Sequence, residues 1–237
     1  MVEYDFKSEN RSNKFSYKLS LVIHALMSVP KTLYFNFRCF PLKTAIRLPV
    51  LMSYKTRIIE LHKGLISFNE KPYRFMIKFG FGGSDGILER KSVICLEGGE
   101  IHFEGKADFC EGISLRNAGN LRFGNRFWAN KNCTIWCSHK MSFGNNTLLG
   151  WNIVFRDSDG HLIIDNDTPR PVEGEISIGN HCWICSECHI LKNSSLGNDC
   201  VLGYGSLLTK NYSRNNALYV GRPAKCVKEN ISWFRGE

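Results

Sequence analysis

The sequence has no apolar run long enough to cross a membrane as a helix. Such a helix needs roughly 18 uninterrupted apolar residues, whereas the longest run of this chain, 19–29, is interrupted by three polar residues and followed by Pro30. The run lies behind a mixed-charge segment and no small-residue cleavage site follows it, so we do not interpret it as a secretory signal peptide. We therefore expect a cytoplasmic protein, at most peripheral at the inner face of the membrane.

Acidic residues are scarce in the first third of the chain. Residues 1–75 hold 13 Lys or Arg against 5 Asp or Glu, whereas residues 76–237 hold 18 against 17, so the net charge of +9 lies mainly in the N-terminal segment. A basic segment can bind nucleic acid, anionic lipid headgroups or an acidic glycan, or form an ordinary solvated surface. No nucleic-acid motif accompanies it, so we expect no nucleic-acid partner and leave the other readings open.

The ordinary signals of a secreted, disulfide-bonded protein are also missing. Ten cysteines without a secretory signal favour free thiols in a reducing compartment. The run His181-Cys182, Cys185 and Cys188-His189 resembles a metal-binding cluster. The repeat described next gives it a structural explanation, and we expect no metal.

The chain contains a repeat that fits neither an α-helix nor an alternating strand. Segments of the form Ile101-His102-Phe103-Glu104 recur at Leu121 and Met141, 20 residues apart, and again at Ile176 after an irregular insertion. From there the period tightens to six residues, with small residues four positions after the aliphatic ones. The six-residue series is Ile178, Ile184, Ile190, Leu196, Leu202 and Leu208, and the small residues are Cys182, Cys188, Ser194, Cys200 and Ser206.

Six residues for each side and eighteen for each turn predict a triangular coil, the parallel β-helix of hexapeptide repeats. Large aliphatic side chains point into the coil, and stacked coils bury a core that no single repeat can form. Cys182 and Cys188 then occupy equivalent small positions on successive sides, so they do not converge on a metal. The fold class predicted is an all-β solenoid.

The two ends of the chain do not repeat. Helical spacing of Leu19, Val22, Ile23, Leu26 and Met27 predicts an amphipathic helix that ends at Pro30 and packs on the coil or docks on a partner or membrane. We divide the chain into a basic N-terminal segment (1–75), a β-helix domain (76–213) and a C-terminal part (214–237). The last part is predicted to contain a loop up to Pro223 and a short helix from Ala224 to Trp233.

The insertion between Phe155 and Ile176 is the predicted site, because loops that leave a rigid scaffold often carry function. It begins Arg156-Asp157-Ser158-Asp159-Gly160-His161. An imidazole can take a proton from a hydroxyl near neutral pH, and a carboxylate within reach can hold its orientation. His161 and Asp159 are therefore the candidate catalytic pair.

Four motifs occur in order along the chain: Phe127 to Ile135, Ile178 to Ile184, Leu202 to Lys210, and Gly221 to Lys225. They resemble the hexapeptide acyltransferase family, in particular sugar O-acetyltransferases of capsule and lipopolysaccharide biosynthesis and galactoside and maltose acetyltransferases. The resemblance covers about residues 100–233. It implies a left-handed helix, a homotrimer with active sites between subunits, and acetyl-CoA as co-substrate with a sugar or glycan acceptor, which can be lipid-linked.

The resemblance also implies roles for individual residues. His161 is the general base, Asp159 orients it, and Asn130 lies near the acceptor. Ser138 stands where galactoside enzymes carry an acidic acceptor-binding residue, so galactoside-like specificity is not expected. Residues implied in binding the donor are Trp183, Ser186, Tyr204, Thr209, Lys210, Lys225 and Lys228.

We therefore predict acetyl transfer from acetyl-CoA to a hydroxyl of a surface-polysaccharide sugar. Three alternatives stay open on the sequence: N-acylation of an amino sugar, a metal-dependent hydratase using His161, His181 and His189, and a non-catalytic scaffold. The N-terminal segment resembles the extension of polysaccharide O-acetyltransferases that work at the inner membrane face.

Overall fold

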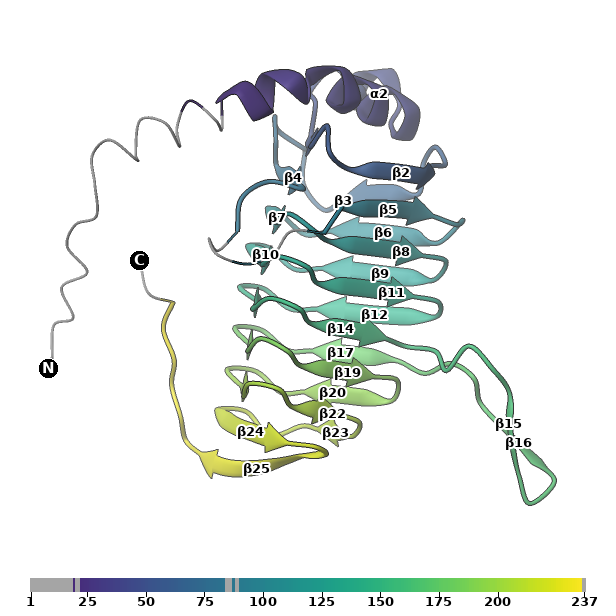
Figure 1. Ribbon diagram of the computed structural model, residues 1–237, viewed down its shortest axis with the longest axis vertical. Helices are drawn as coiled ribbons and strands as arrows, with labels where there is room; N and C mark the ends of the chain where they lie inside the picture. Colours follow the sequence, from purple (N-terminus) through teal and green to yellow (C-terminus); the bar gives the residue numbers. More distant parts are fainter. Residues whose placement is uncertain (1–18, 20–21, 84–86, 88–89, 236–237) are drawn as a thin grey trace, which may run out of the picture.

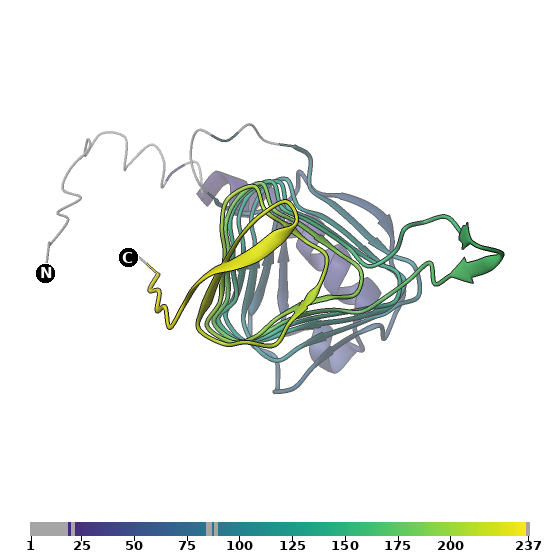
Figure 2. The ribbon, with the colours of Figure 1, turned by 90° about the horizontal axis from the view of Figure 1, so that it is seen from below.

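A computed structural model describes residues 19, 22–83, 87 and 90–235. Most of these residues form a left-handed parallel β-helix whose coils are stacked along the long axis of the molecule (Figure 1). Seen from the end, the coils have a triangular outline, and a two-stranded arm leaves one corner (Figure 2). The predicted solenoid is therefore confirmed.

Each side of the triangle is one parallel sheet. Sheet A contains β1 (Val50–Met52), β4 (Ile77–Phe79), β7 (Ala107–Phe109), β10 (Phe127–Ala129), β13 (Leu148–Leu149), β18 (Trp183–Ile184), β21 (Val201–Leu202), β24 (Ala217–Gly221) and, antiparallel to β24, β25 (Ala224–Glu229). Sheet B contains β2 (Arg57–Glu60), β5 (Val93–Leu96), β8 (Ser114–Asn117), β11 (Thr134–Cys137), β14 (Val154–Arg156), β19 (His189–Leu191) and β22 (Leu207–Leu208). Sheet C contains β3 (Ile66–Phe68), β6 (Glu100–Phe103), β9 (Asn120–Phe123), β12 (Lys140–Phe143), β17 (Ile176–Ile178), β20 (Ser194–Leu196) and β23 (Asn211–Tyr212). The arm is the antiparallel pair β15 (Ile163–Asp165) and β16 (Thr168–Arg170).

The core consists of ladders of identical positions in successive coils. Phe103, Phe123 and Phe143, which carry the 20-residue repeat, stack with ring centroids 5.2 and 5.3 Å apart. The aliphatic residues of the six-residue series are buried, and so are the small residues between them. Cys182 and Cys188 donate their S–H groups to the backbone carbonyls of Gly197 and Gly203 in the coil below. The structural explanation of these cysteines is confirmed.

Helix α2 (Val29–Cys39), followed by the short α3 (Leu42–Ala45), lies across the first coil and closes it. Asn36 donates to the carbonyl oxygen of Val50 (2.7 Å) and accepts its N–H (3.1 Å), and Thr32 pairs with Met52 in the same way (3.3 and 3.1 Å). These side chains satisfy backbone groups of β1 that no further strand pairs. The helix thus caps an edge that would otherwise recruit other strands.

Residues 22–27 are helical, and this helix ends at the turn of Ser28, two residues before Pro30. A second helix, α2, follows directly, with Pro30 in its first turn, where its missing N–H costs no hydrogen bond. The predicted start of the coil is wrong. The coil begins at Val50 and not near Met76. Paired positions in the first coils are 27 and 30 residues apart, against 20 and 18 further on, so loops conceal the period there.

The predicted C-terminal loop and helix are also wrong. Residues 217–221 form β24, and residues 224–229 form β25, which pairs with it antiparallel. The last coil leaves an open sheet edge, and pairing along that edge satisfies backbone groups of both strands. Within the described part of the chain, no helix is both long and apolar enough to cross a membrane.

Candidate active site

The arm is attached to the coil by a buried carboxylate. Asp157 follows β14, is fully buried, and accepts backbone N–H groups of Ser138, His139 and Lys140 at 2.7–2.9 Å. Its own carbonyl accepts the N–H of Gly174 on the returning strand of the loop (2.8 Å). Asp157 therefore holds both ends of the insertion against the turn that follows β11.

A lysine from the next coil anchors the arm from the other side. The ammonium of Lys192, directly after β19, lies 2.7 Å from the carboxylate of Asp159 and donates to the carbonyls of Pro171 and Val172. The backbone N–H of Asp159 also bonds to Val172 (2.9 Å). The two strands of the loop are thus joined at the root before the arm projects into solvent.

His161 lies just beyond this root and is exposed. Among the described residues it has no hydrogen-bond or ion-pair partner, so its ring nitrogens can accept a proton from an incoming group. Among the described residues, the predicted contact of His161 with Asp159 is not formed, and the Asp159 carboxylate pairs with Lys192. The orienting role of Asp159 stays a prediction, and its anchoring role is what the geometry supplies.

A groove of about 310 Å³ runs along the outer face of sheet B and reaches the root of the arm. Arg116, Trp136 and Arg156 occupy equivalent outward positions on β8, β11 and β14, paired in register. The Arg156 guanidinium lies over the Trp136 ring at 5.2 Å, and Arg116 pairs with Glu97 at 2.7 Å. The remaining lining residues are Ala118, Cys137, Ser138, Ser158 and Gly160. Ser138, predicted to contact the acceptor, therefore lines a groove that ends one residue from His161.

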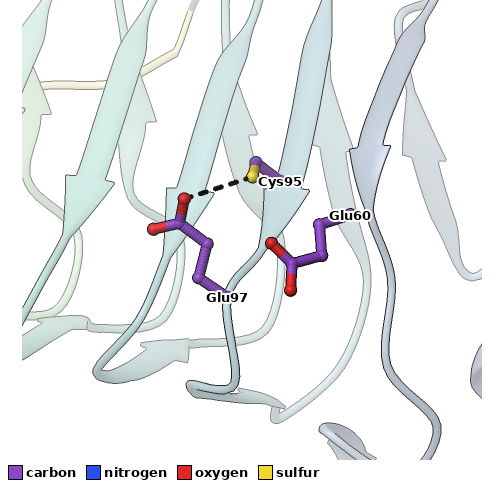
Figure 3. Close-up of side chains that lie close together, drawn as sticks. All are labelled: Glu60, Cys95 and Glu97. Carbon is purple, nitrogen blue, oxygen red and sulfur yellow. Dashed lines mark hydrogen bonds between the residues drawn. The ribbon is translucent and has the colours of Figure 1, made fainter.

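Glu97, at the far end of this groove, also belongs to a group of possible metal ligands with Glu60 and Cys95, whose ligand atoms lie within 4.8 Å of one another (Figure 3). Cys95 donates to Glu97 (3.5 Å). Burial and then this hydrogen bond raise the pKa of the Cys95 thiol, and Arg116 lowers the pKa of the Glu97 carboxyl. A neutral thiol beside a carboxylate already paired with a guanidinium is a weak ligand set, since metals bind the thiolate. We assign no metal to it.

Two of the residues implied in donor binding, Ser186 and Tyr204, lie along the edge where sheet A turns into sheet B. They follow β18 and β21, as the predicted acceptor residue Asn130 follows β10, and backbone bonds connect successive turns there. Ser186 is buried and accepts the N–H of Trp151 (3.0 Å). Lys225 is exposed near the end of β25 adjoining this edge, and Lys228 is exposed further along the same strand.

The structure separates some residues that the sequence placed together. Thr209 and Lys210 follow β22 at the opposite end of the sheet B strands, on the same side as Ser138, and Asn130 and Ser138 lie at opposite ends of β11. A single chain therefore does not gather the predicted donor and acceptor residues into one pocket.

Trp183 lies on sheet A, away from the arm and the groove. Its ring is partly exposed and contacts Trp233, at 5.9 Å between centroids. Trp233 also stacks on His181 (4.3 Å), whose Nδ1 is 2.8 Å from Asp199. Trp183 and His181 thus help hold the C-terminal segment against the coil, and His181 is not directed toward His161.

Sequence reasoning missed the residues that build the site's surroundings. Asp157 and Lys192 anchor the arm, and Arg116, Trp136 and Arg156 line the groove. The sequence does contain a signal for Arg116, Trp136 and Arg156, because they are spaced 20 residues apart, as the Phe repeat is. On a parallel coil, residues one turn apart are neighbours, so equal spacing predicts an outward ladder.

Comparisons with known proteins agree with this architecture. Residues 175–210 match the model for the bacterial transferase hexapeptide (six repeats). The chain is 30% identical to an uncharacterized 24.8 kDa protein in the cps region of Klebsiella pneumoniae, over 39% of this chain and 41% of that protein. It is also 30% identical to the galactoside O-acetyltransferase of Escherichia coli (strain K12), over 46% of this chain and 54% of that one.

Among solved structures, the polySia specific acetyltransferase NeuO is similar, with a TM-score of 0.54 and 20% identity over 80% of each chain. The chain spans about half the length of the curated relatives it matches. The fold and the resemblance to hexapeptide-repeat acyltransferases that the motifs predicted are confirmed.

Proposed function

We propose that this protein is an O-acetyltransferase that moves the acetyl group of acetyl-CoA to a hydroxyl of a surface-polysaccharide sugar. The observation that carries the proposal is the position of His161. Its imidazole, which has no hydrogen-bond partner among the described residues, lies just after the anchored root of the arm. The arm leaves sheet B after β14, between the groove strands and the coils that carry the predicted donor residues. The acetyltransferase names of similar proteins support the reaction class.

The chemistry needs a base and no covalent intermediate on the protein. A neutral His161 takes the proton of the acceptor hydroxyl, and that oxygen attacks the thioester carbonyl carbon. The resulting oxyanion is stabilised by a backbone N–H. The C–S bond then breaks, and the departing CoA thiolate takes the proton back from the imidazolium. Because burial raises the pKa of Cys133 and Cys188 to about 12, these thiols are poor nucleophiles and fit a mechanism without an acyl-enzyme.

The donor is proposed to lie along the coil below the arm. Ser186, Tyr204, Thr209 and Lys210 are assigned to the pantetheine arm, and Lys225 and Lys228 to the nucleotide phosphates, where exposed ammonium groups can pair with anions. Trp183 is left out, because its contact with Trp233 places it on another face.

A homotrimer fits this arrangement. The assigned residues occupy both ends of the sheet B strands, so two neighbouring chains can each supply one edge of a shared site. The arm supports the same assembly, since Ile163 and Ile164 on β15 are exposed where the arm projects away from the coils (Figure 2).

The helical cap is proposed to contact the inner membrane surface. The apolar stripe, for which packing on the coil and docking on a partner or membrane were both open, is exposed in this chain and continues along α2. Its members are Val22, Ile23, Leu26, Met27, Val29, Leu33, Tyr34 and Phe37. Exposed Arg38 and Lys43 lie beside it, so the cap combines an apolar face with cations that suit anionic headgroups. Such a surface keeps the enzyme near lipid-linked glycan precursors.

Two other reactions remain as alternatives to the proposal. An amine of an amino sugar can replace the hydroxyl, since the same base serves both. A hydratase would need His161, His181 and His189 at one metal, but the contacts of His181 with Asp199 and Trp233 disfavour this.

The proposal is tested by incubating the protein with acetyl-CoA and a panel of sugars while CoA release and product mass are followed. His161→Ala is expected to lower transfer by roughly 10²–10⁴-fold without changing the oligomeric state or the unfolding temperature. His62→Ala, an exposed histidine on the loop after β2, is the matched control. Full transfer by His161→Ala would disprove the assignment. Transfer to an amino group alone would replace it by the N-acyl alternative.

A further inference from the structure

The groove on sheet B has a graded charge along its length. Its upper end carries one carboxylate, that of Glu97. Arg116 follows one strand down and is paired with Glu97 (2.7 Å). Arg156 occupies the lower end beside the arm. The lining is therefore net positive, and its uncompensated cation lies at the end nearest His161.

Arg156 is held in place but not neutralised. Among the described residues, no carboxylate forms an ion pair with its guanidinium, which instead lies over the Trp136 ring. Trp136 is itself oriented, because its indole N–H donates to Ser114 (3.1 Å). A cation over an aromatic face keeps its outer N–H groups available, and a guanidinium presents them as a planar fork suited to a carboxylate.

The Arg156 guanidinium lies close to the backbone that carries the proposed base, His161. A Cβ added to Gly160 would lie 3.7 Å from the Arg156 guanidinium, so the backbone that carries His161 runs directly past it. A sugar whose carboxylate is bound by Arg156 would therefore have its ring hydroxyls close to His161. A groove of about 310 Å³ holds a single sugar residue of a longer chain.

We propose that this groove, with Arg156 as its specificity-determining residue, binds an acceptor sugar that bears a carboxylate, such as a uronic or sialic acid unit of an acidic glycan. This inference rests on the proposed function. A sugar phosphate shares the anionic chemistry, but one unpaired guanidinium matches a monoanion better than a dianion. A neutral sugar would leave the fork without a partner.

The test compares sugars that differ in the carboxylate, namely the methyl glycosides of glucuronate and glucose, those of galacturonate and galactose, and the methyl glycoside of N-acetylneuraminate. Binding is followed by the NMR signal of the Trp136 indole N–H, assigned with Trp136→Phe, and transfer by kcat/KM. We expect at least one acidic sugar to shift this signal at millimolar concentration and to be preferred over its neutral counterpart by tenfold or more. Arg156→Gln should reduce that preference at least tenfold, mainly through KM, and Arg156→Lys should restore part of it.

Arg122→Gln is the matched control, since Arg122 is exposed on sheet C and paired with Glu104 away from the groove. It should leave the preference unchanged. Equal losses for acidic and neutral sugars in Arg156→Gln would overturn the inference, as would tighter binding of glucose 6-phosphate than of every carboxylated sugar. If no sugar is acetylated but a carboxylated one binds through Arg156, the proposed function fails and the inference stands. Absence of binding by every carboxylated sugar overturns the inference whether or not transfer occurs.

Discussion

Lys192 binds Asp159 at 2.7 Å across two successive coils, and this ion pair fastens the arm that carries His161. Lys192 also donates to two carbonyls on the returning strand of the loop. Its ammonium is therefore shared by both strands of the insertion. Asp159 can therefore have one of two roles, orienting the His161 imidazole or anchoring the arm. The two roles predict different effects of substitution.

An anchoring role predicts that Asp159→Asn and Lys192→Met have similar and non-additive effects. Each removes the same ion pair, so the double variant should have about the same transfer activity as the less active of the two single variants. Hydrogen exchange should rise in residues 159–172 in all three, with little change in unfolding temperature. Lys106→Met, which removes an exposed lysine paired with the buried Asp108 in another coil, is the control. An orienting role would instead make Asp159→Asn far more damaging to kcat than Lys192→Met.

The cations of β25 are predicted to act on the nucleotide part of the donor. Replacing Lys225 and Lys228 together by alanine should raise KM for acetyl-CoA roughly threefold to fivefold, because an exposed ion pair contributes at most about 1 kcal/mol. KM for acetyl-pantetheine, which lacks the nucleotide phosphates, should not change. Lys106→Ala is again the control. An equal rise with both donors would place the two lysines elsewhere than at the phosphates.

The apolar cap is predicted to bind anionic lipid. Co-sedimentation with phosphatidylglycerol vesicles should be strong at low salt and weak with phosphatidylcholine vesicles. Leu26→Asp and Leu33→Asp should each reduce it several-fold, whereas Val227→Asp, on the exposed face of β25 at the other end of the coil, should not. Binding that is unaffected by lipid charge and by both leucine substitutions would refute the membrane contact.

Asn36 is predicted to matter for stability through hydrogen bonding to β1. Asn36→Ala leaves the buried N–H and carbonyl of Val50 without their side-chain partner, which should lower the free energy of unfolding by about 2–4 kcal/mol. Asn69→Ala, at an exposed position before β4, should change it by less than about 0.5 kcal/mol. Denaturant unfolding measures both. A small effect of Asn36→Ala would mean that water or local rearrangement replaces the lost bonds.

Buried thiols predict a loss of stability at alkaline pH. Burial raises the pKa of Cys39, Cys110, Cys133 and Cys188 from about 9 to about 12. These thiols ionise more easily in the unfolded chain, so their contribution is complete below pH 9 and is lost as pH rises toward 12. Between pH 10 and 11, Cys133→Ala should make the fall of the free energy of unfolding with pH shallower by about 1.4 kcal/mol per pH unit. A fall as steep as that of the unsubstituted protein would contradict this.

Much of the coil could be predicted because its period is local. The Phe repeat, the six-residue aliphatic series and the small cysteines follow directly from 20 or 18 residues per turn, and all are buried as expected. Where paired positions are further apart, as Val50 and Ile77 or Ile77 and Ala107 are, the same geometry leaves no regular spacing, and the first coil was not predicted.

The sequence by itself determined the solenoid, the insertion and the candidate base His161, because each is a property of spacing or of residue type in one segment. Only the tertiary structure decided what surrounds that base. Asp159 and Lys192 are 33 positions apart, and Trp136 and Arg156 are 20, yet the parallel coil makes each pair neighbours. The tertiary structure also decided how the two ends of the coil are closed. Side chains of α2 and the strand β25 form hydrogen bonds with the terminal strands, whose open edges exist only once the coil has formed.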